Sequence, residues 1–287
     1  MIRLSVNVLS SAILLLHRLK HYHFTSLTEL TYMKIASISV EDIFEFSRNC
    51  GWVYESEDVP ILTPRGNGLL KLYDQGFQSD LKRTMLMDYV INASPIWSNR
   101  ILYGRSEAAI FMTKDERACF AETSLLSDKL DPNIIEWWDT ISSKIREKTQ
   151  QERNDIGRIG ERNTIQYERT RTNSEPKWMS IESNLAGYDI KSMLSADDHS
   201  VLLIEVKTST SSLDQAYFHV TSHEWGVAQT SSAYVFHLWC LSENEKLLAI
   251  IPPDDIYPYI PTNNLNGEWE STKIPFLCFE SRFIEIV

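Results

Sequence analysis

The hydrophobic pattern changes after Pro176, and this change constrains the fold more than any other feature of the sequence. Upstream, apolar residues recur at helical spacing. Downstream, short runs rich in β-branched and aromatic residues are separated by Asn, Ser, Asp and Gly. Strands are expected at residues 179–182, 188–194, 201–208 and 234–241. Thr221-Ser222-His223-Glu224 has the form of a capping box and predicts a helix between the last two strands. The element order, helix, three strands, helix and strand, predicts an α/β fold with a mixed central sheet.

The region before this change reads as helical. Residues 40–49 have apolar side chains at near-helical spacing and end before Gly51, which is a typical helix stop. Two more helical patterns cover residues 80–92 and 107–126. Asp131 as N-cap and Pro132 at the first position then begin a long helix toward Gly157. Trp137 and Trp138, early in this helix, are expected to pack in a core.

One short segment suggests a more specific N-terminal fold. Residues 61–66, Ile-Leu-Thr-Pro-Arg-Gly, resemble the turn of winged-helix domains at which a helix ends and a small wing begins. A helical scaffold without a DNA-reading role is the alternative interpretation. With a boundary in the polar stretch 148–155, the expected domains are an N-terminal extension (1–33), a helical recognition or docking domain (34–150) and a C-terminal domain (151–287).

Charge limits how this chain can contact nucleic acid. The formal net charge of -11 argues against nonspecific binding, which depends on neutralising phosphates, so any DNA contact must be local. One stretch is basic, with nine Lys or Arg against six acids: Lys144, Arg146, Lys148, Arg153, Arg158, Arg162, Arg169, Arg171 and Lys177. It predicts a strip that contacts the DNA backbone, unless it is a solvated helix face.

The first residues and the cysteines indicate the compartment. The apolar run at residues 4–16 is too short to span a bilayer and is followed by His and basic residues without a cleavage site. We expect a start-site extension before Met33 or a packed N-terminal helix, and a cytoplasmic protein without a membrane anchor. The four cysteines are widely scattered and show no metal-ligand spacing, which favours reduced structural thiols.

The strand at residues 201–207, Val-Leu-Leu-Ile-Glu-Val-Lys, carries the candidate chemistry. Side chains alternate along a strand, so Glu205 and Lys207 point the same way while Ile204 and Val206 point into the core. Asp189 begins the preceding strand, and a hairpin turn at residues 195–200 would bring it beside Glu205. Two carboxylates can share Mg²⁺ or Mn²⁺, and the adjacent ammonium can orient an attacking water.

Several motifs in the right order resemble a known family. Asp189, Glu205, Val206 and Lys207 match the D…ExK signature of the PD-(D/E)XK nuclease superfamily, with Tyr188 in place of the proline of the parent motif. The local sequence pattern is similar to that of the NO VEIN C-terminal domain, which occurs in bacterial restriction and defence proteins. The motifs that carry this likeness are Gly157-Arg158-Ile159-Gly160-Glu161, Gly187-Tyr188-Asp189-Ile190, Ile204-Glu205-Val206-Lys207, Phe218-His219-Val220-Thr221 and Glu224-Trp225.

This resemblance implies a restriction-endonuclease-like α-β-β-β-α-β core and a Mg²⁺- or Mn²⁺-dependent DNA endonuclease used in restriction or anti-phage defence. It also implies that Glu161 is a further active-site acid that contacts metal, against the alternative of a solvated carboxylate. No phosphate-binding Gly-Lys-Ser/Thr motif is present, which is compatible with a larger defence complex in which a separate ATPase supplies motion. A homodimer would suit double-strand cleavage, since each site handles one scissile phosphate. The competing hypothesis is a non-catalytic module that binds nucleic acid or protein. For His219 and His223, structural roles are favoured, with His219 facing the site as the alternative.

Overall fold

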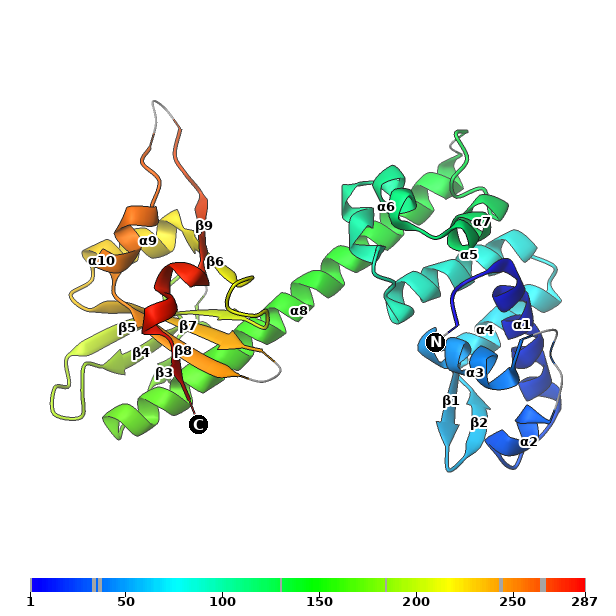
Figure 1. Ribbon diagram of the computed structural model, residues 1–287, viewed down its shortest axis with the longest axis horizontal. Coiled ribbons are helices and arrows are strands. Elements are labelled where there is room, and N and C mark those ends of the chain that lie inside the picture. Colours follow the sequence, from blue (N-terminus) through cyan, green and yellow to red (C-terminus); the bar gives the residue numbers. More distant parts are fainter. Residues whose placement is uncertain are drawn as a thin grey trace. The chain divides into compact units, whose positions relative to one another are not determined.

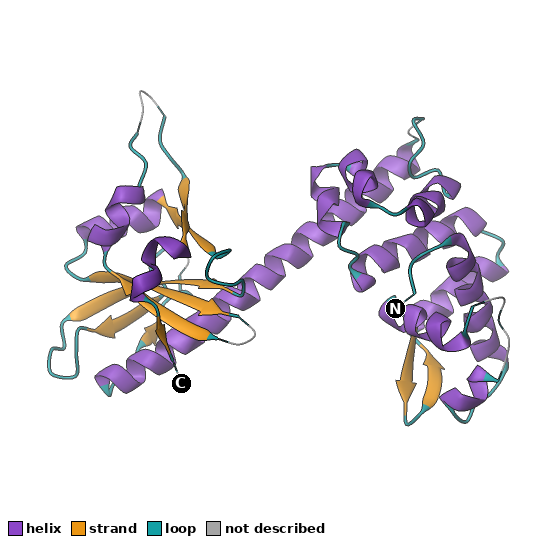
Figure 2. Cartoon of the chain, viewed as in Figure 1, coloured by secondary structure: helices purple, strands orange, loops and turns teal. Residues whose placement is uncertain are grey.

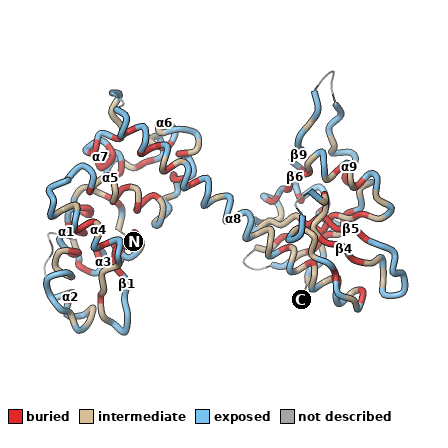
Figure 3. The backbone as a smooth tube through the Cα atoms, turned by 180° about the vertical axis from the view of Figure 1, so that it is seen from behind, coloured by how far each residue is buried: buried red, intermediate tan, exposed pale blue. Residues whose placement is uncertain are grey.

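A computed structural model describes residues 2–32, 35, 38–129, 131–183, 185–242, 245–263 and 267–286. The chain divides into two compact units, residues 1–149 and 150–287. The division falls inside one continuous helix, α8 (Pro132–Thr172). The polar stretch expected as a boundary is therefore helical, and residues 150–155 within it are all exposed (Figure 3). Met33, the alternative start site, lies outside the described residues.

Unit 1 is mainly helical, as predicted, with a single two-stranded hairpin among its described residues (Figures 1 and 2). Its elements before α8 are α1 (Val6–His21), α2 (Leu27–Thr31), α3 (Val40–Asn49), β1 (Val53–Ser56), β2 (Val59–Leu62), α4 (Pro64–Asp74), α5 (Gln78–Asp88), η1 (Tyr89–Ala93), η2 (Ser98–Tyr103), α6 (Arg105–Phe111) and α7 (Lys114–Glu122). The helix expected at 107–126 is thus two helices, because Thr113 leaves the helical conformation to cap α7.

The apolar N-terminal run forms a packed helix. Ser5 caps α1, and Leu15 and Leu16 are fully buried in the same core as α3 and α7. Trp137 and Trp138 of α8 are buried in this core, which confirms their predicted role. Among the helices of the described residues, none is both long and apolar enough to cross a membrane.

The segment that resembles a winged-helix turn runs in the opposite order to the one expected. Here the β1–β2 hairpin ends at Leu62, and Thr63 caps the start of α4 by accepting a hydrogen bond from the Gly66 N–H at 3.0 Å. A Cβ on Gly66 would lie 2.2 Å from the Trp52 carbonyl oxygen, so this close approach requires glycine. The hairpin carries Glu55 in β1 and Glu57 and Asp58 in its turn. These acids repel phosphate and disfavour DNA contact by the hairpin.

Unit 2 is built on a mixed six-stranded sheet in the order β10-β8-β7-β5-β4-β3. Its strands and helices after α8 are β3 (Lys177–Trp178), β4 (Ile190–Met193), β5 (Val201–Ser209), β6 (Tyr217–Thr221), α9 (Ser222–Thr230), β7 (Tyr234–Leu241), β8 (Lys246–Ile251), α10 (Pro253–Ile256), η3 (Tyr257–Tyr259), β9 (Ser271–Pro275), η4 (Phe276–Arg282) and β10 (Ile284–Glu285). Strand β5 pairs parallel to β7 and antiparallel to β4. This confirms the predicted α/β class and mixed central sheet.

Helices cover the two faces of this sheet. On one face Ile204, Val206 and Trp239 pack against the C-terminal part of α8, and on the other α9 and α10 pack over β7 (Figure 1). Gly160 lets α8 approach β5 closely, because a Cβ there would lie 1.8 Å from Thr208 Oγ1. One helical turn on, Thr164 Oγ1 accepts a hydrogen bond from Trp239 Nε1 at 2.7 Å. These contacts fix α8 against the strand that bears the candidate site.

One predicted strand was wrong, and β6, β8, β9 and β10 were not predicted. Residues 179–182 form a turn, in which the Met179 and Ser180 N–H groups both donate to the Asp189 carbonyl oxygen. Residues 217–221, for which no strand was predicted, form β6. This strand pairs with β9 in a separate ribbon. The ribbon joins residues about fifty positions apart, so local periodicity could not reveal it.

Candidate active site

Glu205 and Lys207 lie on one face of β5, as their spacing predicts. Lys207 Nζ is 2.7 Å from Glu205 Oε1, and their side chains are 15% and 7% exposed. Ile204 and Val206 alternate to the other face, in the core against α8. The strand therefore presents a carboxylate and an ammonium together from within an apolar sheet.

Asp189 lies immediately before β4, and the antiparallel register places it next to Glu205. Ile190 pairs with Ile204, and the Asp189 N–H donates to the Ile204 carbonyl oxygen at 2.9 Å. Asp189 Oδ2 accepts a hydrogen bond from the Val206 N–H at 2.9 Å. The turn over residues 195–200 closes the β4–β5 hairpin, with the Leu194 N–H donating to the Ser200 carbonyl oxygen. The two acids named by the sequence thus meet on adjacent strands.

Glu161 reaches the region from α8. Its Oε2 accepts hydrogen bonds from Trp178 Nε1 and Ser180 Oγ, and Arg158 Nη1 lies 2.9 Å from the same oxygen. The side chain is 12% exposed, so it is not the solvated carboxylate of the alternative interpretation. Its negative charge contributes to raising the pKa of Asp189, so the two carboxylates interact electrostatically.

Glu224 is part of the same cluster and was missed as a candidate site residue. Its Oε1 lies 3.0 Å from Lys207 Nζ, while Oε2 accepts a hydrogen bond from the Thr221 N–H at 2.8 Å. The capping box that predicted α9 therefore also holds Lys207. Its capping-box position gave a structural reason for this acid. The one other signal was its place in the Glu224-Trp225 motif of the family likeness, which did not indicate the contact with Lys207.

Burial and mutual repulsion shift the pKa values of these groups. Burial, with Glu161 and Glu224 nearby, raises the pKa of Asp189 to about 6, against the opposing effects of the Val206 N–H and Lys207. Burial and the charge of Asp189 likewise raise the pKa of Glu205. Burial acts to lower the pKa of Lys207, yet Glu205 and Glu224 outweigh it and raise this pKa. The ammonium therefore stays charged, and the excess charge of the cluster is negative.

The cluster has the charge and the donor atoms for a divalent cation. Four carboxylates (Glu161, Asp189, Glu205 and Glu224) face two cationic side chains (Arg158 and Lys207), which leaves a formal charge of about -2 when every carboxyl group is ionised. Among the described residues, no group of three or more His, Cys, Asp and Glu is arranged to hold a metal ion. Mg²⁺ usually takes only one or two carboxylates together with water and substrate phosphates. Asp189 and Glu205 fit that pattern.

The comparison with known families agrees with the position of this cluster. The family model described as "Protein NO VEIN, C-terminal" matches residues 160–250. No curated protein and no solved structure matches the chain significantly. The match begins within α8 and ends within β8, so it includes Glu161, Asp189, Glu205, Lys207 and Glu224.

The basic strip predicted along and just after α8 is partly neutralised. Four of its members pair with carboxylates, and Lys148 donates to the Ile91 carbonyl oxygen and Ser94 Oγ. The four ion pairs are Arg158–Glu161, Arg169–Glu175, Arg171–Glu168 and Lys177–Glu182. These ion pairs interrupt the C-terminal half of the strip, and contact of the strip with DNA stays a prediction. The acids that neutralise them lie three to six positions along the chain, within reach of one helical turn or the following loop.

His219 and His223 take different positions within residues 160–250, which the family model matches. His223 Nε2 lies 3.0 Å from the Leu185 carbonyl oxygen, which is the favoured structural role. His219 is exposed on β6, where its ring stands edge-on to that of Tyr217.

The cysteines belong to no metal-ligand cluster within the described residues. All four are free thiols, of which Cys50, Cys119 and Cys240 are buried and Cys278 is exposed. Burial raises the pKa of Cys50 and of Cys119. These shifts suit unreactive structural thiols.

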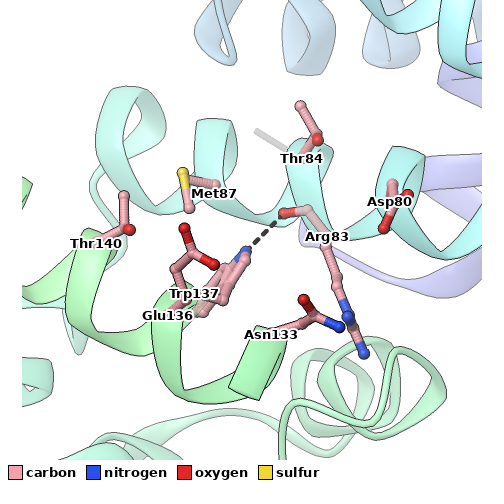
Figure 4. A pocket seen from close by; sticks show the side chains of 8 residues that line it. All are labelled: Asp80, Arg83, Thr84, Met87, Asn133, Glu136, Trp137 and Thr140. Carbon is pink, nitrogen blue, oxygen red and sulfur yellow. Dashed lines mark hydrogen bonds between the residues drawn. The ribbon is translucent and has the colours of Figure 1, made fainter. Parts of the chain in front are cut away.

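Unit 1 has a separate hollow of about 400 Å³ between α5 and α8 (Figure 4). Its wall is formed by Asp80, Arg83, Thr84, Met87, Asn133, Glu136, Trp137 and Thr140. Trp137 Nε1 donates to the Arg83 carbonyl oxygen at 3.0 Å, which fixes the indole in the wall. Two carboxylates face one guanidinium in this lining, a charge balance that does not favour phosphate.

Proposed function

We propose that unit 2 is a divalent-metal-dependent nuclease domain that hydrolyses phosphodiester bonds in DNA. The observation that carries this proposal is the meeting of Asp189 and Glu205 on adjacent strands, with Lys207 beside Glu205 on the same face. The NO VEIN family match over residues 160–250 and the D…ExK motif support it.

In this proposal the site residues have different roles in hydrolysis. Asp189 and Glu205 would hold Mg²⁺ or Mn²⁺, and Glu161 would be the further acid that contacts the metal. The cation supplies charge stabilisation at phosphorus and lowers the pKa of a bound water. Lys207 donates hydrogen bonds to the attacking water and offsets the negative charge that develops on the phosphate. Glu205 and Glu224 hold the ammonium of Lys207 in position.

The test is cleavage of supercoiled plasmid by the purified chain with Mg²⁺ or Mn²⁺. Asp189→Asn removes one metal-binding charge at nearly constant volume and should abolish nicking and linearisation. Asp197→Asn is the matched control, because Asp197 lies exposed in the β4–β5 turn and should leave cleavage unchanged. Equal cleavage by the wild type and Asp189→Asn, or no cleavage with either cation, contradicts the proposal.

One observation favours a second function, a non-catalytic module that binds nucleic acid. Each of the three carboxylates first assigned to the site already accepts a hydrogen bond from a protein donor, and they form no ready three-acid ligand group. Such a module would bind DNA equally well in EDTA and in Mg²⁺. The nuclease predicts tighter binding with a non-activating cation such as Ca²⁺.

The biological setting that we propose is bacterial restriction or anti-phage defence, in complex with a separate ATPase or as a homodimer. Only the family likeness supports this setting. Phage plating on cells that express the wild type or Asp189→Asn tests it. Equal plaque numbers on both strains contradict a defence role that depends on this site.

A further inference from the structure

The β6–β9 ribbon has one buried and one exposed face. His219 pairs with Lys273 across the ribbon, and Tyr217 pairs with Pro275. Phe218 and Val220 of β6 point into the core. The alternating side chains of both strands therefore form an outer face, which consists of Tyr217, His219, Thr221, Ser271, Lys273 and Pro275.

This outer face combines a cation with aromatic rings and has no acid among its six side chains. Lys273 Nζ lies 3.4 Å from the centroid of the Tyr217 ring. The His219 ring stands edge-on to Tyr217, with centroids 5.7 Å apart. Tyr217, His219 and Lys273 are all exposed. In a chain of net charge -11, this is a local surface that attracts phosphate.

One end of the ribbon, at Thr221, lies next to the candidate site. Thr221 ends β6, caps α9 and donates its N–H to Glu224, whose other oxygen contacts Lys207. Figure 1 shows β6 and β9 side by side next to α9. At roughly 3.4 Å per residue, His219 lies about 7 Å and Tyr217 about 14 Å from Thr221 along the strand. The outer face therefore suits the nucleotides that flank a cleaved bond, not the cleaved phosphate itself.

We propose that the outer face of the ribbon binds the phosphodiester backbone of the DNA strand next to the cleavage position. Lys273 and the His219 ring N–H contact phosphate oxygens, while Tyr217 holds the Lys273 side chain in place by the cation–π contact. The inference rests on the proposed function in taking DNA as the substrate, but it concerns binding and not hydrolysis.

The experiment is fluorescence anisotropy of a labelled 20-base-pair DNA duplex, titrated with the full chain in Ca²⁺ at several salt concentrations. Lys273→Gln should weaken binding about fivefold or more at low salt and lower the slope of log affinity against log salt by about one. His219→Gln and Tyr217→Leu should weaken binding less. Lys246→Gln is the matched control, because Lys246 also lies over an aromatic ring, 5.6 Å from Trp239, but on β8.

The outcomes separate this inference from the nuclease proposal. Wild-type affinity and salt slope for Lys273→Gln overturn the ribbon contact even if the protein cleaves plasmid. Equal losses for Lys273→Gln and Lys246→Gln overturn it as well, as does absence of wild-type binding at low salt. Loss with Lys273→Gln alone supports the ribbon contact, whether or not hydrolysis is found.

Discussion

Lys207 Nζ is held between Glu205 Oε1 at 2.7 Å and Glu224 Oε1 at 3.0 Å, so two carboxylates from different elements fix one ammonium. Strand β5 supplies Glu205 and helix α9 supplies Glu224. The geometry makes Lys207 a positioned group and not a freely rotating surface lysine. Five predictions follow from this arrangement and from the packing that supports it.

Lys207→Ala should reduce plasmid cleavage by about 100-fold or more while leaving the fold intact, because it removes the ammonium that stabilises charge on the phosphate. Lys207→Arg should not restore full activity, since a planar guanidinium cannot occupy the same place between two carboxylates. Single-turnover cleavage rates and circular dichroism check both variants. A normal cleavage rate in Lys207→Ala would remove this residue from the mechanism.

Glu224→Gln should lower the cleavage rate about tenfold with little change in KM, because the amide still caps α9 but no longer holds the Lys207 charge. Thr221→Ala weakens the same cap from its other side and is the control for helix stability. Steady-state kinetics of both variants separate the two roles. Equal loss of activity in the two variants would mean that Glu224 acts only through the cap.

Glu161→Gln should raise the Mg²⁺ concentration for half-maximal cleavage by about 10- to 100-fold, as expected when a group near a metal loses its charge. Trp178→Phe removes the indole N–H that donates to Glu161 and keeps an aromatic ring near Arg158, so its effect should be smaller. Mg²⁺ titrations of the cleavage rate measure both. An unchanged Mg²⁺ requirement in Glu161→Gln would assign this carboxylate to structure alone.

Acidification should destabilise unit 2 through His237. The ring is fully buried, and Glu168 and Arg171 are the charged groups that act on it. Burial lowers its pKa to about 4, whereas an unfolded histidine titrates near about 6.5. The unfolded chain therefore takes up the proton first, and the contribution of His237 to the free energy of unfolding should fall by about 3 kcal/mol between about pH 6.5 and pH 4. The raised pKa values of Asp189 and Glu205 act in the opposite direction, so the effect of His237 is read as a difference from a variant that lacks the ring.

Hydrogen exchange of β7 amides across this pH window checks the effect of His237 inside unit 2. His237→Leu is the comparison, because it removes the titrating ring from the same buried position. As the pH falls from about 6.5 to 4, the free energy of unfolding of this variant should rise relative to that of the wild type. The same change with pH in both proteins would assign the pH dependence to other groups.

Gly160→Ala should destabilise unit 2 by about 1–3 kcal/mol, because the new Cβ would overlap Thr208 Oγ1. Thr208→Ala in the same chain should recover most of this loss, since Thr208 Oγ1 is buried without a hydrogen-bond partner in the described part of the chain. Gly157→Ala, with open space around its Cβ, is the control and should stabilise α8 slightly. Thermal unfolding of the single variants and of the Gly160→Ala, Thr208→Ala double variant gives the coupling energy between residues 160 and 208. Additive losses of stability would exclude the overlap.

The local sequence determined those parts of the protein that depend on near neighbours. Alternation along residues 201–207 placed Glu205 and Lys207 on one face, and Asp131 and Thr221 marked helix starts that the structure has. The helix at 40–49 and the strand at 234–241 have the predicted bounds. These features rest on side-chain period and on hydrogen bonds within three or four residues, which a single sequence displays directly.

Only the tertiary structure decided which distant groups meet. Glu224 contacts Lys207 across 17 positions, and Trp178 donates to Glu161 across another 17. The same holds for three other features, which depend on how α8 and α9 cover the sheet. They are the β6–β9 ribbon, the paired arginines of α8 and the burial that raises the pKa of Asp189. Such contacts are selected by packing of whole elements, so composition and spacing name the reactive residues but not their partners.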